Sequence, residues 1–113
     1  MGINRIVTIN NGFDAYVGEI HDGLFHGWGT MRYASGTVYY GYWKNGKIHG
    51  NGECRYANGD IYRGEYFEHK IHGHGTYIEH TGQTYIGEWI HGHKHGHGSM
   101  YYVNNYDEYT GNW

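Results

Sequence analysis

The chain has 113 residues, enough for one small domain and too few for two independent cores. Aromatic residues make up 19% and there are 21 glycines but no proline, which excludes the composition of a typical disordered segment. The 8 basic residues against 11 acidic ones give a formal net charge of −3, which argues against a nucleic-acid-binding protein.

The N-terminal segment and the cysteine content bear on location. Met1 to Ile9 contains one basic residue and no apolar run of signal-peptide length, and no run in the chain approaches the roughly 20 apolar residues of a membrane helix. Cys54 is the only cysteine, so no internal disulfide forms and a reducing compartment is allowed. We therefore expect an intracellular, cytoplasmic protein, with association to the cytoskeleton or to a membrane left open.

A period of 23 residues organises the chain. Each unit begins with a tyrosine that is followed two residues later by a glycine and ten residues later by a histidine, which opens an H-G-x-G string. The tyrosines are Tyr16, Tyr39, Tyr62 and Tyr85, and the histidines are His26, His49, His72 and His95. A fixed period in this range indicates a repeat array. The predicted segments are 1–15 (a half repeat and connector), 16–38, 39–61, 62–84, 85–108 and 109–113 (a partial fifth repeat).

Taken in chain order, the predicted elements are strands. Ile6 to Gly12 matches the second half of a unit, and four β-hairpins follow, with first strands such as Tyr85–Trp89 and short second strands such as Thr30–Tyr33. Asp22-Gly23 and Asn45-Gly46 supply residues that tolerate the positive φ of a tight hairpin turn. The sequence thus predicts an all-β fold without helix: one elongated, single-layer antiparallel sheet rising about 10 Å per repeat.

The repeated unit, Y-x-G-E-W-x-x-G-x-x-H-G-x-G-x-x-x-Y-x-x-G, resembles the MORN repeat. Residues 39–59 fit it closely, as Y-Y-G-Y-W-K-N-G-K-I-H-G-N-G-E-C-R-Y-A-N-G, and the resemblance extends from Ile6 to Trp113. It implies an open sheet of hairpins found in cytoskeletal, ciliary and membrane-contact scaffolds, and attached to lipid kinases and methyltransferases. The roles it implies are protein binding, end-to-end self-association and lipid binding.

Three positions depart from the repeat. Glu68-His69 stands where the other units have a residue pair that contains the turn glycine, and this predicts an altered or strained turn. Glu79 stands where the other units have tyrosine, and Asn104-Asn105 replaces x-Gly.

Period-two alternation gathers tyrosine, tryptophan and methionine on one face of the sheet. A single sheet has no second layer to bury this face, and its composition is typical of protein-recognition surfaces, so we expect a peptide, a helix or another copy to bind there. Packing of these rings on one another and on the glycines is the alternative, and it explains part of the pattern. The predicted contacts are Tyr39, Trp43, Tyr56, Tyr62, Tyr66, Tyr85, Trp89 and Tyr102. The opposite face carries Glu19, Arg32, Arg55, Glu65 and Glu88.

Both ends of an open sheet leave an unpaired strand edge, which is a template for adding another chain. The predicted self-association edges are Ile6, Val7 and Ile9 at one end and Tyr109 and Trp113 at the other. We expect a homodimer, because closed symmetric pairs are commoner than open filaments.

The 11 histidines suggest two further hypotheses. His91, His93, His95 and His97 alternate and are weak candidates for a metal site. The histidine of each H-G-x-G string is instead expected to lie at the turn and to hold it by a ring hydrogen bond. Protonation of all histidines would change the formal charge from −3 to +8, so binding of anionic phospholipids in mild acid is the alternative function.

The sequence contains no catalytic constellation. Cys54 is predicted to be a small core residue, because no histidine is adjacent to it in the strand pattern. The H-G-x-G strings lack the following helix and the lysine of a phosphate loop. We expect neither enzymatic activity nor a cofactor.

Overall fold

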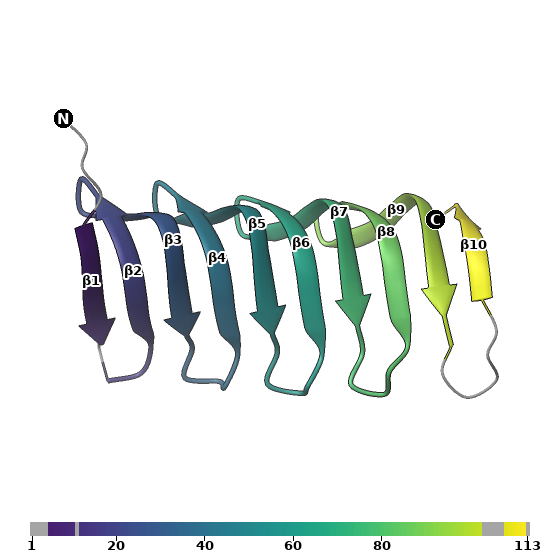
Figure 1. Ribbon diagram of the computed structural model, residues 1–113, viewed down its shortest axis with the longest axis horizontal. Coiled ribbons are helices and arrows are strands. Elements are labelled where there is room, and N and C mark those ends of the chain that lie inside the picture. Colours follow the sequence, from purple (N-terminus) through teal and green to yellow (C-terminus); the bar gives the residue numbers. More distant parts are fainter. Residues whose placement is uncertain (1–4, 11, 103–107, 113) are drawn as a thin grey trace.

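The structure is a computed structural model that describes residues 5–10, 12–102 and 108–112. These residues form one ten-stranded antiparallel sheet in which the spatial order of the strands is their order in the chain (Figure 1). The molecule measures 51 × 28 × 16 Å, so its length corresponds to strands stacked about 5 Å apart. The expected all-β, elongated, single-layer fold is confirmed, with no helix in the described part of the chain.

The strands run nearly the full width of the sheet. They are β1 (Arg5–Asn10), β2 (Ala15–His21), β3 (Leu24–Arg32), β4 (Val38–Lys44), β5 (Lys47–Arg55), β6 (Ile61–Phe67), β7 (Lys70–Ile78), β8 (Thr84–Ile90), β9 (His93–Tyr101) and β10 (Glu108–Asn112). The second strand of each unit is longer than predicted because it includes the H-G-x-G string; β3, for example, has 9 residues. The expectation that these histidines lie in the turns was therefore wrong.

A row of paired glycines crosses the sheet. Gly18 pairs with Gly29, Gly29 with Gly41 and Gly41 with Gly52, and the pattern continues through the later repeats. The register shifts just after the glycine of each first strand, for example between Gly41 and Trp43, which is the signature of a β-bulge. Because these glycines have no side chain and are followed by a bulge, each first strand can bend here. A tyrosine ring fills the space over the glycines.

All described hairpin turns that join first and second strands of a repeat have the same backbone. Asn45-Gly46 has φ of 50° and 85°, which matches a two-residue turn with positive φ at both positions. Glu68-His69 adopts φ of 47° and 70° without a glycine, so the turn is retained at a cost of about 1–2 kcal/mol per strained residue. The backbone N–H of His69 donates to the carbonyl of Ile48 at 2.9 Å, and this bond to the preceding hairpin holds the strained turn in place.

Candidate functional site

The aromatic face contains a continuous ladder of rings. Neighbouring rings meet edge to face with centroids 5.1–5.8 Å apart, a favourable geometry for aromatic pairs. The rings of this aromatic ladder are, in spatial order, Tyr16, Trp43, Tyr39, Tyr66, Tyr62, Trp89 and Tyr85. In the second, third and fourth repeats the residue at position five (Trp43, Tyr66 and Trp89) thus fills the gap between the first tyrosine of its own repeat and that of the preceding repeat.

Each first tyrosine is fixed at its hydroxyl as well as at its ring. The hydroxyl of Tyr62 donates to the carbonyl of Glu65 at 2.9 Å, and that of Tyr39 donates to the carbonyl of Tyr42 at 2.9 Å. Burial raises the pKa of Tyr16 to about 12, so the phenol stays protonated and remains a donor at neutral pH. The ladder therefore locks each bulge to the ring that lies over it.

The structure buries most of the predicted protein contacts in this ladder. Their exposed fractions are Tyr39 0%, Trp43 2%, Tyr62 0%, Tyr66 7%, Tyr85 1% and Trp89 6%. Tyr102 is 38% exposed and Tyr56 is half-buried, so these two members of the predicted set offer more surface to a partner. Cys54 is buried in the same core, as predicted, and its burial raises the pKa of the thiol.

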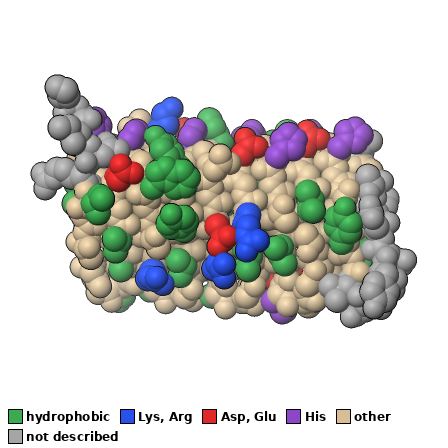
Figure 2. All heavy atoms as spheres, in the orientation of Figure 1, with side chains coloured by type: hydrophobic (Ala, Val, Ile, Leu, Met, Phe, Trp, Pro, Cys, Tyr) green, Lys and Arg blue, Asp and Glu red, His purple; other side chains and the backbone are tan. Residues whose placement is uncertain are grey.

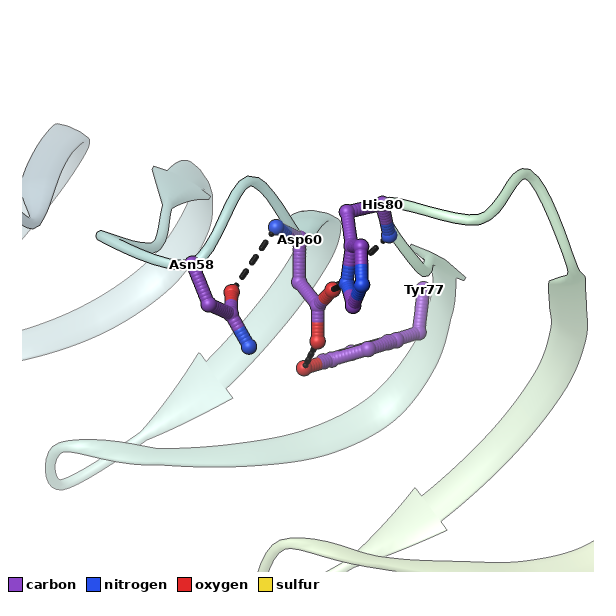
Figure 3. A network of polar contacts seen from close by, with 4 residues as sticks. All are labelled: Asn58, Asp60, Tyr77 and His80. Atoms are coloured by element: carbon purple, nitrogen blue, oxygen red, sulfur yellow. Dashed lines mark hydrogen bonds and ion pairs between the residues drawn. The ribbon is translucent and has the colours of Figure 1, made fainter.

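A buried carboxylate joins the second and third repeats (Figure 3). Asp60, which is 8% exposed, accepts a 2.6 Å hydrogen bond from the Tyr77 hydroxyl and a 2.8 Å bond from the backbone N–H of His80. The ring Nδ1 of His80 lies 3.0 Å from the same carboxylate, and the side chain of Asn58 accepts from the Asp60 N–H. Both carboxylate oxygens are occupied, so the group acts as a clamp between repeats.

This clamp accompanies one of the departures from the repeat pattern. The third unit has Glu79 at the position that Tyr56 occupies in the second unit. The ring of Tyr77, two residues earlier, packs against Tyr56 with centroids 5.8 Å apart. Asp60 then receives the hydroxyl of Tyr77. The sequence signals this cluster only weakly, because its members come from two repeats and are spaced irregularly.

We expect the Asp60 clamp to stabilise the fold in a pH-dependent way. The hydrogen bond from Tyr77, followed by those from His80, lowers the pKa of Asp60 from 3.8 to about 2 although burial opposes the shift. A depressed pKa contributes stability that is complete above about pH 4 and lost as the pH falls towards 2, here about 2 kcal/mol. The free energy of unfolding of Asp60→Asn should therefore be lower than that of the wild type at pH 7 and converge with it near pH 2.

Asp22→Asn is the matched control for this prediction. Asp22 is 87% exposed at its side chain and lies 3.3 Å from a histidine, so it also has an imidazole partner but is not enclosed. Chemical unfolding of both variants across the acid range should show no comparable pH-dependent difference for Asp22→Asn. An equal difference at pH 7 and pH 2 for Asp60→Asn would show that the carboxylate charge is not what stabilises the clamp.

The opposite face of the sheet carries an exposed aromatic and charged cluster, the outer patch, made of Trp28, Tyr40, Glu53, Arg55 and Arg63. Trp28 and Tyr40 are 51% and 57% exposed, with ring centroids 6.3 Å apart. Glu53 accepts from the Nε of Arg55 at 2.8 Å and from the Nε of Arg63 at 2.6 Å. The hydrogen bonds from Arg63 and then Arg55 lower the pKa of Glu53, so its charge is retained in mild acid.

Sequence reasoning placed Arg55 on this face but missed Trp28 and Tyr40. The signal was available for Tyr40, because it directly follows Tyr39 and period-two alternation puts consecutive residues on opposite faces. Figure 2 shows this face, with an acidic group between two basic ones near its middle and hydrophobic side chains beside them.

The histidines do not converge on a metal site. Within the described residues no three His, Cys, Asp or Glu side chains are placed to hold an ion, and this includes His91, His93, His95 and His97. The ring of His26 accepts a 3.2 Å hydrogen bond from the N–H of Asn45. A ring hydrogen bond to a turn is therefore present, but it joins the histidine to the turn of the following repeat.

The two edge strands are each paired on one side in the described structure, β1 with β2 and β10 with β9. Ile6 and Ile9 are 79% and 45% exposed, whereas Val7 is half-buried and packs against the core. Trp113, the Asn104-Asn105 departure and the side chain of Tyr109 lie outside the described residues. Among the described elements there is no helix of the length and apolarity needed to cross a membrane.

Comparison with protein families identifies the repeat. A family model described as MORN repeat matches four segments, residues 16–38, 39–61, 62–83 and 85–105. A comparison with curated proteins gives no match for this chain.

Proposed function

The chain belongs to the MORN-repeat family, and we propose that it is a non-catalytic scaffold or adaptor that binds a protein partner or a second copy of itself. The observation that carries the proposal is that aromatic side chains remain accessible on a sheet whose core is already complete. Tyr56 packs against the buried core and stays partly exposed, and Tyr102 is 38% exposed. Accessible tyrosine beside a rigid surface is the composition and geometry of a protein-binding site.

The proposal assigns different roles to the predicted contacts on the aromatic face. The buried rings, such as Trp43 and Tyr62, keep the repeats in register, and Tyr56 and Tyr102 contact the partner. A rigid ladder lowers the entropic cost of binding, because the contact residues are held in place before the partner arrives.

Affinity capture from cell lysate, followed by cross-linking of bound proteins, tests the aromatic face. The double variant Tyr56→Ser, Tyr102→Ser should lose the captured partner. Because Tyr56 also packs against Tyr77, capture is carried out at a temperature at which melting curves show both the variant and the wild type to be folded. Tyr101→Ser is the matched control, because Tyr101 is 40% exposed and adjacent to Tyr102 but belongs to the opposite face. Equal capture by the wild type and the double variant, or cross-links confined to other surfaces, would contradict this assignment.

Self-association through the edges is a separate part of the proposal. At this edge β1 exposes the β-branched residues Ile6 and Ile9, and none of the described side chains of β1 carries a charge that would hinder pairing with another chain. Ile6→Lys with Ile9→Lys should shift a homodimer to monomer in light scattering at tens of micromolar protein, roughly the range of a modest interface. A wild-type protein that is monomeric throughout this range would contradict self-association.

Binding of anionic phospholipid is the second candidate, and the distribution of exposed histidines favours it. His69 and His91 are exposed in hairpin turns, and Lys44, Lys47 and His49 line, together with Glu68, a hollow of about 410 Å³ beside the turns. Protonation in acid would add positive charge to this region. Vesicles containing anionic lipid should then bind weakly at pH 7.5 and more strongly near pH 5.5, whereas absence of binding at both values would exclude this candidate.

A further inference from the structure

The outer patch has an organised geometry that packing of the fold does not require. Tyr40 of β4 pairs across the sheet with Glu53 of β5, which in turn pairs with Arg63 of β6, so the aromatic ring and the charged groups form one row. Trp28 lies beside this row on β3, with its ring 5.9 Å from that of Tyr42. Exposed tryptophan, tyrosine and arginine side by side are the residue types that dominate binding energy at protein interfaces.

The patch is hollowed between its aromatic and its charged parts. A depression of about 300 Å³ is lined by Trp28, Tyr40, Asn51, Gly52, Glu53 and Arg63. Its size suits one apolar side chain of a partner, and the aromatic pair supplies apolar walls for it. The buried rings of the ladder lie on the other face of the same strands, so the depression has a rigid base.

Basic groups outnumber acidic ones at the end of the depression near Arg55 and Arg63, whereas Glu65, which pairs with Asn51 across the sheet, lies beside its other end. Glu53 is the acidic residue of the row, and it is flanked by Arg55 and Arg63. Arg32 is also exposed and lies on β3, two strands from Arg55 on β5; both residues pair with Val38 on the strand between them. Both Arg55 and Arg63 bind Glu53 through Nε, which fixes the two guanidinium groups in place. A fixed guanidinium retains outer N–H donors that match a carboxylate, with less entropy lost on binding than for a free side chain.

We infer that the outer patch binds a segment of a partner protein in which an apolar side chain is flanked by carboxylates. The apolar side chain fills the depression between Trp28 and Tyr40, and the carboxylates meet Arg55 and Arg63. The carboxylate of Glu19 accepts from the backbone N–H of Trp28 at 2.7 Å, so the acidic groups of the partner lie on the arginine side of Tyr40. This inference rests on the proposed protein-binding function and adds a second surface with a defined partner chemistry.

The test uses the full chain and synthetic peptides as probes. A fluorescein-labelled peptide with a central phenylalanine between glutamates is compared with peptides in which the glutamates are replaced by glutamines or by lysines. Fluorescence anisotropy gives the affinity, and the indole N–H resonance of Trp28, assigned with Trp28→Phe, reports the location. We expect the glutamate peptide to bind most tightly, to perturb Trp28 and to bind more weakly as salt is raised.

Two variants should remove this binding and one should not. Trp28→Ser and Arg63→Gln should each weaken the glutamate peptide about tenfold or more, as for interface hot spots. Ile86→Ser is the matched control, because Ile86 occupies the position of Tyr40 in the fourth repeat and is 47% exposed, but has Ser99 rather than an acid–arginine pair beside it. Melting curves of all three variants should stay close to that of the wild type.

The outcomes separate this inference from the proposed aromatic-face site. Equal binding of the lysine peptide, no binding of the glutamate peptide up to about 1 mM, or unchanged binding by Trp28→Ser would each overturn the outer patch as a site for acidic segments. If Tyr56→Ser with Tyr102→Ser abolishes peptide binding instead, the aromatic-face proposal stands and the outer patch is excluded. If Trp28→Ser converts a peptide-free dimer to monomer, the occupant is a second copy and the inference is wrong.

Discussion

Tyr62→Ala should lower the free energy of unfolding by about 3–5 kcal/mol, the usual cost of deleting a large buried aromatic ring. Tyr62 is 0% exposed and its ring meets Tyr66 at 5.2 Å and Trp89 at 5.8 Å, so its removal opens a gap in the middle of the ladder. The bond from its hydroxyl to the carbonyl of Glu65 is lost as well. Urea unfolding followed by tryptophan fluorescence measures the change.

The matched control for this change is Tyr40→Ala. Tyr40 is 57% exposed on the opposite face, so its truncation should alter stability by no more than about 0.5 kcal/mol. Because each repeat of a linear array contacts only its neighbours, Tyr62→Ala should also broaden the unfolding transition by uncoupling the two halves. Similar losses for the two variants would contradict the assignment of Tyr62 to the core and of Tyr40 to the surface.

Gly52→Ala should destabilise the protein by about 3 kcal/mol, although the change adds a single methyl group. A Cβ at Gly52 would lie 2.6 Å from Cε1 and Cζ of Tyr39, and even closer to its hydroxyl oxygen, while Trp43 and Tyr66 prevent the ring from moving aside. The backbone of Gly52 does not have positive φ, so the loss is due to collision with the ring. Thermal and urea unfolding provide the measurement.

A double-mutant cycle tests this cause. In a Tyr39→Ala background the methyl group at Gly52 has no ring to displace, so Gly52→Ala should cost much less there than in the wild type. Asn51→Ala, at the exposed neighbouring position, is the control for introducing an alanine into the same strand away from the tyrosine ring. An equal cost of Gly52→Ala in both backgrounds would show that the tyrosine ring is not the obstacle.

The sequence alone was sufficient to predict the architecture of this protein. The 23-residue spacing from Tyr16 to Tyr39 defined the repeat, alternation defined two faces, and Asn45-Gly46 marked a hairpin turn. These features are local, so they can be recognised within one or two units of the chain. The same local pattern could not place the H-G-x-G histidines correctly, because strand length depends on pairing with the next hairpin.

Only the tertiary structure decided which aromatic side chains are covered. Alternation places Trp43 and Tyr56 on one face, but it does not show that Trp43 inserts between Tyr16 and Tyr39, or that the bulge brings each tyrosine over a glycine pair. The clamp at Asp60 likewise depends on a partner 20 residues away. Burial and hydrogen bonding are set by contacts between repeats, and those contacts exist only after the sheet has bent, so a pattern within one repeat cannot determine them.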